Sequence, residues 1–274
     1  MVYQLYLPSF AAPGAGALRG VTARIPYLAA LGIDAVWLSP FDPSALADDE
    51  DDTSAGPGPG ISQYPQPGTL ADFEEMTWAL EAHGIKVIAD LVPNGEAFDF
   101  ELLEADWGGA QFLRVITGRL PGGLRDRVPA TWVLSSRDAD PRRARAAALL
   151  MLALPGSAFL YQGEELGRHE TADLAPVIRA QEHDPGSPLN LYRHALGWRR
   201  KLQAAESLEW MPGTSGQVLH FRRPGGWRSV TNFGPHAVPL PPGTVIAASA
   251  PREGAQLDRG VLPADTTAWI ISAD

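Results

Sequence analysis

Charged side chains that follow predicted strands are the residues of this 274-residue sequence that could do chemistry. Arg137 and Asp138 come directly after the apolar run TWVLSS, and Glu96 comes soon after KVIADLV, the run that contains Asp90. In sheets of parallel strands, ligand-binding groups gather at the carboxyl ends of the strands. A pair of carboxyl groups at such an edge, one ionised and one protonated, could act as general base and general acid.

Each of these side chains also has a structural interpretation. Asp138 suits the N-cap of the helix expected after it, because aspartate is favoured there. Arg137 would pair with Asp138 and hold it ionised. Glu96 could be a surface or loop carboxylate. Asp52 ends the acidic run DDEDD, which is typical of a solvated loop.

Alternating strand and helix patterns must position these groups. Apolar runs predict strands, and apolar residues at helical spacing predict helices. The strands are expected at 2–7, 35–38, 86–92, 131–135 and 157–161, and the helices at 18–31, 70–83, 111–119, 142–154 and 189–202. Thr69 is placed to begin a helix and Gly32 to end one. This order predicts a right-handed βα-wound parallel sheet.

The pattern changes near residue 205. Short strands are predicted between Gly/Pro turns with no helix among them, at 218–222, 228–232, 238–240, 245–248 and 267–271. Such spacing is typical of an antiparallel β-domain. We therefore predict one domain over residues 1–204 and a second, β-sandwich-like domain over 205–274.

Composition narrows the function classes. Lys+Arg 22 against Asp+Glu 32 gives a formal net charge of −10, which argues against nucleic acid or an anionic membrane as partner. Cysteine is absent, so a disulfide framework, a thiolate nucleophile and a cysteine-ligated metal are excluded. We see no basic n-region followed by an apolar run and no apolar stretch of about 18 residues, so a cytoplasmic location is expected.

Several segments resemble a known family. VYQLYLPSF, DAVWLSPF, KVIADLVPN, FDFELLEADW and LPGSAFLYQGEELG are similar to α-glucosidases of glycoside hydrolase family 13, the α-amylase family. The resemblance implies a (β/α)₈ barrel with a C-terminal β-sandwich. It also implies cleavage of α-glucosidic bonds with retention, by an Asp nucleophile, a Glu acid/base and a second Asp that steadies the transition state.

The resemblance gives roles to individual residues. Asp138 matches the transition-state-stabilising Asp, and Arg137 stands where the family has a hydroxyl-binding His. Glu96 matches either the acid/base in G-E-A-F or a non-catalytic position of a later segment. Asp52 matches a loop Asp that grips a sugar hydroxyl.

Other matched positions support the site. Asp90 and Asn94 fall in a D-x-V-x-N segment that supports it from strand three, and Gln162 and Glu164 match residues that hold the rim together. Two aromatic side chains could stack on a sugar or simply pack, Phe10 and Tyr64. Some relatives use the Asn for calcium, but its co-ligands are missing here. We expect no metal and no cofactor.

The sequence departs from the family at its centre. The strand-four motif G-F-R-x-D, which carries the nucleophile, is absent, and five strand–helix units are found where a closed barrel needs eight. The fold class predicted is therefore α/β, an incomplete (β/α) TIM-type barrel followed by a small C-terminal antiparallel β-domain. Strand 86–92 would lose a neighbour on one side. Segment 95–105 could cover this edge, a second copy of the chain could pair with it, or the sheet could stay open in a poorly soluble protein. We expect the first outcome, with segment 95–105 near the edge of strand 86–92.

Three functions remain open. The first is an α-glucosidase by descent, acting on α-glucosides or oligosaccharides, with no appreciable turnover expected because the nucleophile segment is missing. The second is an inactive relative that binds carbohydrate or a protein. The third is a deletion product without an evolved task.

Overall fold

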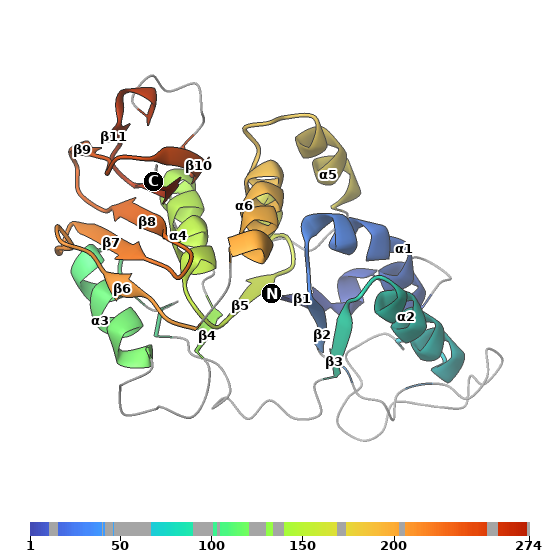
Figure 1. Ribbon diagram of the computed structural model, residues 1–274. Helices are drawn as coiled ribbons and strands as arrows, with labels where there is room; N and C mark the ends of the chain where they lie inside the picture. The colour runs from blue at the N-terminus through green and yellow to red at the C-terminus, as the bar shows by residue number, and fades with distance from the viewer. Residues whose placement is uncertain are drawn as a thin grey trace. The chain divides into compact units, whose positions relative to one another are not determined.

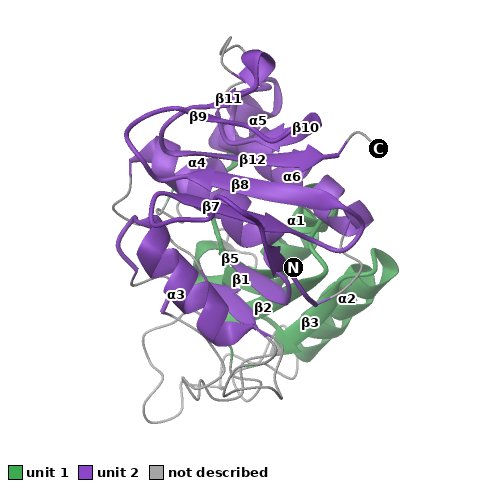
Figure 2. Cartoon of the chain, turned by 60° about the vertical axis from the view of Figure 1, so that its left-hand side comes forward, with its two compact units in different colours: residues 1–95, 160–163, 168–175 green, residues 96–159, 164–167, 176–274 purple. Residues whose placement is uncertain are grey.

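The computed structural model describes twelve ranges of the chain: 1–10, 16–39, 41, 46, 67–89, 101–102, 105–120, 130–133, 140–168, 174–202, 206–250 and 257–272. They form two compact units (Figure 2). The first comprises residues 1–95, 160–163 and 168–175, and the second comprises 96–159, 164–167 and 176–274. A boundary at 204–205 stays a prediction.

The first unit is built on parallel strands (Figure 1). Its elements are β1 (Val2–Tyr6), η1 (Leu7–Phe10), α1 (Ala17–Leu31), β2 (Ala35–Ser39), α2 (Leu70–Ala82) and β3 (Lys86–Ala89). Val2 lies opposite Ala35, and Ala35 lies opposite Lys86. The strand ends at Tyr6, one residue before the predicted end, because Leu7 already begins the 3₁₀ turn.

Helix ends in this unit follow the sequence signals. Gly32 ends α1 in the left-handed conformation, with φ 96°, which favours glycine. Thr69 caps α2: its hydroxyl accepts from the N–H of Asp72 at 3.1 Å, and the Asp72 carboxylate accepts from the N–H of Thr69 at 2.9 Å. Arg19 of α1 donates to the other oxygen of Asp72 at 2.6 Å, so the cap also joins the two helices.

The second unit combines helices with an antiparallel sheet (Figure 1). Its elements are α3 (Gly109–Arg119), β4 (Thr131–Val133), α4 (Pro141–Ala153), the start of β5 (Ser157–Tyr161), η3 (Glu164–Leu166), α5 (Ala175–Glu182), α6 (Pro188–Leu202), β6 (Glu209–Trp210), β7 (Val218–Arg222), β8 (Trp227–Asn232), β9 (Val238–Pro239), β10 (Thr244–Ala248), η4 (Leu257–Arg259), β11 (Val261–Leu262) and β12 (Thr266–Ile271). The larger antiparallel sheet has the order β10-β12-β8-β7-β6, and β11 pairs with β9.

Both faces of the larger sheet are packed. On one face, Trp269 donates its indole N–H to the carbonyl of Leu149 in α4 at 3.1 Å, and Thr267 donates to that of Ala146 at 2.8 Å. On the other face, Val230 and Ile270 form a core with Leu257, Leu262 and Ala268. This two-sided burial confirms an antiparallel β-domain.

Arg199 secures the end of α4. Its guanidinium is buried and donates to the carbonyl oxygens of Leu152, Leu154 (2.9 Å) and Gly156 (2.7 Å). Helix ends leave such carbonyls without intrahelical partners. A single charged side chain of α6 therefore satisfies the turn that leads from α4 into β5.

The parallel sheet has five strands in the order β3-β2-β1-β5-β4, with β3 and β4 at its edges. The incomplete barrel is thus confirmed for the described residues. The predicted segment 95–105 lies mostly outside them. Six short elements were not predicted, namely α5, β6, β11 and the 3₁₀ turns η1, η3 and η4. No helix in the described ranges is both long and apolar enough to cross a membrane.

Candidate functional site

Most predicted site residues lie outside the described part of the chain. These are Asp52, Tyr64, Asp90, Asn94, Glu96, Arg137 and Asp138. Phe10 ends η1, and its side chain also lies outside the description. The predicted pairing of Arg137 with Asp138, and the catalytic roles of Asp138 and Glu96, therefore stay predictions. Gln162 and Glu164 are the predicted residues whose surroundings are described.

Gln162 closes a hydrogen-bonded ring at the carboxyl ends of β1 and β5. Its Oε1 accepts from the backbone N–H of Tyr6 at 2.9 Å, and its Nε2 donates to Ser9 Oγ at 2.5 Å. Ser9 in turn donates to the carbonyl of Tyr6 at 2.7 Å. The Gln162 side chain is buried, at 7% exposure, so both ends of its amide are fixed by protein partners.

The loop after β5 is held next to this ring. Gly163 donates its N–H to the hydroxyl of Tyr3 at 3.3 Å, and its carbonyl accepts from Arg168 N–H at 2.9 Å. Gly163 has φ 88°, and a Cβ there would lie 3.1 Å from the Arg168 carbonyl oxygen. The positive φ favours glycine, and any Cβ would also press against the Arg168 carbonyl oxygen.

Glu164 lies in the second unit and contacts α6. Its Oε1 accepts a 3.2 Å hydrogen bond from the hydroxyl of Tyr192. Burial, and then the Glu164 and Glu165 carboxylates, raise the pKa of Tyr192 well above its ordinary value. The phenol therefore stays protonated and remains a donor to Glu164.

The ring formed by Tyr6, Ser9 and Gln162 can hold the strand end and the following turn in place, but it cannot transfer protons. An amide, a hydroxyl and backbone groups donate and accept hydrogen bonds, but none titrates near neutral pH. Within the described ranges, no group of three or more His, Asp or Glu side chains could hold a metal ion. Proton transfer would have to come from the carboxylates predicted at the same edge.

Three residues of these contacts, Tyr3, Ser9 and Tyr192, were not predicted from the sequence. Tyr3 is part of an apolar strand, Ser9 follows Pro8 in a turn, and Tyr192 lies on the apolar face of a helix. Only the hydroxyl group in an otherwise apolar setting could have drawn attention to Tyr3 and Tyr192, because a buried hydroxyl needs a partner.

A family model matches the N-terminal part of the chain. The model described as "Alpha amylase, catalytic domain" matches residues 4–106, which include β1, η1 and the strands β2 and β3. Over this range the chain is similar to the α-amylase family. The recognition made from the sequence motifs is thereby confirmed.

Curated relatives also match part of this chain. An α-glucosidase of Pediococcus pentosaceus is 42% identical over 101 residues, covering 34% of this chain and 17% of that protein. The trehalose-6-phosphate hydrolase of Escherichia coli (strain K12) is 38% identical over 101 residues, with the same coverage. Maltase 1 of Drosophila virilis is 34% identical over 142 residues, covering 48% and 21%. The matches span about a fifth or less of the relatives' length.

Solved structures share the fold along the whole chain. The α-amylase from H. orenii has a TM-score of 0.71 at 17% identity, covering 99% of this chain and 99% of that one. The isomaltulose synthase SmuA from Protaminobacter rubrum has a TM-score of 0.68 at 13% identity, covering 98% of each. The α-amylase from Geobacillus thermoleovorans, solved with acarbose, has 0.64 at 12%, covering 98% and 97%.

Proposed function

We propose that this chain is a glycoside hydrolase of the α-glucosidase type by descent, and that it binds α-glucosidic oligosaccharides without appreciable hydrolysis. The observation that carries the proposal is the ordered ring of Tyr6, Ser9 and Gln162 at the carboxyl ends of β1 and β5. Ligand groups of barrel enzymes lie at this end of the strands. The chain therefore has an ordered strand end where a ligand could bind, but its sequence lacks the G-F-R-x-D segment that carries the family's nucleophile.

The ligand class follows from the relatives. Their names include α-glucosidase, maltase and oligo-1,6-glucosidase, and one structural neighbour was solved with acarbose. These names support α-glucosides as the ligands to test first. Loss of a covalent nucleophile lowers turnover by about 10⁴-fold or more in enzymes that depend on one, which is why binding is proposed without hydrolysis.

The proposed roles follow the motif matches. Asp138 would stabilise charge on the sugar, with Glu96 as acid/base or as a loop carboxylate. The side chains proposed to contact sugar are Phe10, Asp52, Tyr64 and Arg137, and those proposed to support the site are Asp90, Asn94, Gln162 and Glu164. We also propose a division into domains over residues 1–204 and 205–274, and a cytoplasmic location.

Calorimetric titration with maltose and with acarbose tests the binding. We expect saturable heat with the native chain, weakened about tenfold or more by Asp138→Asn, because a lost hydrogen bond to a charged group is worth about 1.5–3 kcal/mol. Asp258→Asn, an exposed aspartate of η4, serves as the matched control and should bind as the native chain does. No binding of either sugar would favour a protein-binding relative or a deletion product.

We also propose that a second copy pairs at the edge of β3. This strand is at the edge of the parallel sheet, and Ile88 in it is 40% exposed. Exposed apolar edge strands pair readily with other strands, and charged side chains on the edge oppose this. Ile88→Lys would add a second charge to a strand that already begins with the exposed Lys86. Sedimentation should show a dimer that Ile88→Lys converts to a monomer. A native chain that is monomeric at all concentrations would contradict the pairing.

A further inference from the structure

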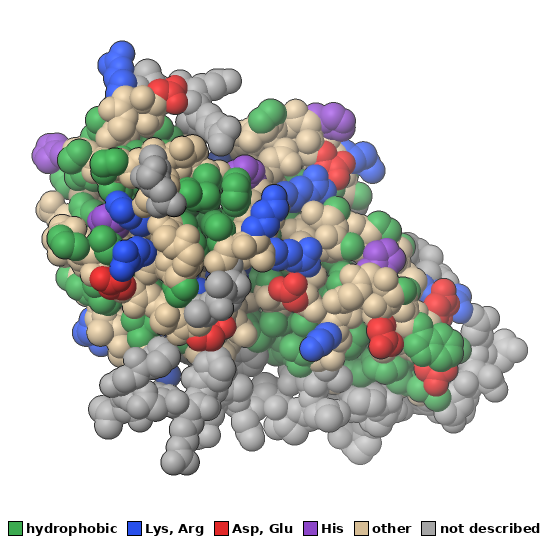
Figure 3. Space-filling model, viewed as in Figure 1, with side chains coloured by type: hydrophobic (Ala, Val, Ile, Leu, Met, Phe, Trp, Pro, Cys, Tyr) green, Lys and Arg blue, Asp and Glu red, His purple; other side chains and the backbone are tan. Residues whose placement is uncertain are grey.

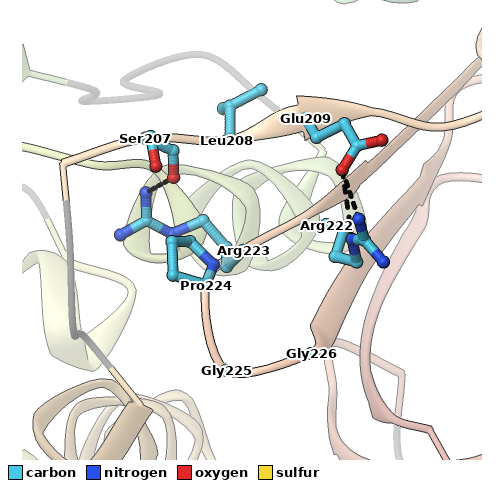
Figure 4. Close-up of a pocket in the computed structure, with 8 residues that line it drawn as sticks. All are labelled: Ser207, Leu208, Glu209, Arg222, Arg223, Pro224, Gly225 and Gly226. Atoms are coloured by element: carbon cyan, nitrogen blue, oxygen red, sulfur yellow. Dashed lines mark hydrogen bonds and ion pairs between the residues drawn. The ribbon is translucent and has the colours of Figure 1, made fainter.

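A hollow of about 350 Å³ lies in the second unit, at the turn between β7 and β8. Its walls are the segment that leads into β6 and the end of β7 with the following turn (Figure 4). The lining residues are Ser207, Leu208, Glu209, Arg222, Arg223, Pro224, Gly225 and Gly226. Small-molecule sites begin at about this volume, so the hollow can accommodate a small ligand.

The turn between β7 and β8 forms one wall of the hollow, and its backbone is held by hydrogen bonds. Arg223 donates its N–H to the carbonyl of Trp227 at 2.8 Å, and Gly226 donates to the carbonyl of Arg223 at 3.1 Å. Gly225 and Gly226 have φ of 88° and 82°, and a Cβ at either would meet nothing within 4 Å. The left-handed conformation, and not crowding, therefore requires these glycines. They leave peptide groups next to open space.

Arg223 fixes the opposite wall. Its side chain is buried, at 2% exposure, and its Nη1 donates to the carbonyl of Ser207 (Figure 4). The contact ties the segment before β6 to the end of β7. The two walls are thus held together without a ligand, which lowers the ordering cost of binding.

A charged pair provides the accessible polar groups. Arg222 donates from both Nε (3.2 Å) and Nη2 (2.5 Å) to one oxygen of Glu209, Oε2. Their side chains are 48% and 62% exposed, and basic and acidic side chains lie together over this part of the sheet (Figure 3). The pair offers a donor group beside an acceptor group. Its charges cancel, and the third charge of the lining, Arg223, is buried.

We propose that this hollow binds a neutral polyhydroxylated ligand, the chemical class of a sugar. Adjacent hydroxyl groups can accept from Arg222 and donate to Glu209 at the same time, because each hydroxyl both donates and accepts. The half-buried side chains of Leu208 and Pro224 offer apolar contact to the carbon face of such a ligand. An anion that approached Arg222 would also meet the Glu209 carboxylate, whereas a neutral ligand meets no such repulsion.

Amide NMR of the full chain tests the inference, with maltose as neutral probe and inorganic phosphate as anionic probe. Maltose should shift the Gly225 and Gly226 signals, and phosphate should not. Glu209→Gln should weaken this response about tenfold. The matched control is Glu182→Gln, which alters another Glu–Arg pair, in which Arg193 Nη2 lies 3.0 Å from Glu182. This variant should leave the glycine response to maltose unchanged.

Three results would overturn the inference: no glycine shift with maltose, a shift with phosphate instead, or equal effects of the two glutamate variants. Asp138→Asn separates this site from the proposed function. If maltose binds with heat that Asp138→Asn abolishes, but the glycine signals never move, the inference fails while the proposed function stands. If the glycine signals move in the native chain and in Asp138→Asn, and the two proteins give the same heat with maltose, the inference stands and the proposed function fails.

Discussion

The backbone N–H of Tyr6 donates a 2.9 Å hydrogen bond to Oε1 of Gln162, a residue 156 positions later in the chain. The bond joins the carboxyl end of the first strand to the loop that follows β5. Gln162 also donates to Ser9, so one amide fixes both the strand end and the 3₁₀ turn after it. The rim of the incomplete barrel is therefore ordered on this side by a side chain, although the described strands do not close a ring.

Gln162→Leu should destabilise the protein by about 1–2 kcal/mol, because the Tyr6 N–H and Ser9 Oγ lose partners in a partly buried setting. Urea unfolding followed by circular dichroism measures the difference. Gln4→Leu makes the same change at a half-buried glutamine of β1 and is the control. Equal unfolding midpoints for the two variants would contradict the importance of the ring.

Asp72 should give the first unit a stability that disappears in acid. Burial raises the pKa of Asp72, but hydrogen bonds from Thr69 and Arg19 outweigh it, so the pKa lies below its ordinary value of 3.8. The ionised form is favoured in the folded state. Its stabilisation is complete above the unfolded value and is lost as pH falls through the lower folded pKa.

The comparison of native protein with Asp72→Asn tests this at several pH values. The variant should be less stable by about 1 kcal/mol near neutral pH, as expected for a weakened helix cap. The gap should narrow below pH 3.8, where the native carboxylate also becomes neutral. A gap that stays constant down to strong acid would show that the charge of Asp72 contributes nothing.

Arg199→Met should cost about 3 kcal/mol or more in the second unit, since three carbonyl oxygens around the end of α4 lose a charged donor. Chemical unfolding gives the value. Arg179→Met, at an exposed arginine of α5, should change stability by about 0.5 kcal/mol or less. Similar losses in the two variants would argue against the role of Arg199.

Gly156→Ala and Gly118→Ala should have opposite effects. Gly156 has φ 93°, and a Cβ there would lie 2.2 Å from the Ala130 carbonyl oxygen, so a loss above about 1 kcal/mol is expected. Gly118, in α3, would place its Cβ in open space, so alanine should stabilise by about 0.4–1 kcal/mol. Thermal unfolding of both variants checks the sign. A neutral Gly156→Ala would contradict the close approach.

The regular elements were predictable where the sequence has strong local signals. The capping pair Thr69 and Asp72, Gly32 after α1, and Pro155-Gly156 after α4 all mark ends that the structure shows. The open parallel sheet was predictable because the strand that carries the nucleophile has no counterpart in the sequence.

Other features depend on tertiary contacts and could not be predicted from the sequence. The strand β6 is two residues long, Glu209–Trp210, and exists by pairing with Arg222 and Phe221 of β7. The ring through Gln162 joins residues 156 apart, which no local pattern encodes. The resemblance suggested Gln162 as a rim residue, whereas its partners Tyr6 and Ser9 came from the structure.

Hydrolysis of p-nitrophenyl α-glucoside by the purified chain tests whether turnover has been lost. We expect a rate that does not exceed that of the Asp138→Asn variant, because the segment with the family's nucleophile is absent. Measurable release of p-nitrophenol that Asp138→Asn abolishes would contradict it. Such a result would mean that another carboxylate, with Glu96 and Asp90 as first candidates, has taken over the role of nucleophile.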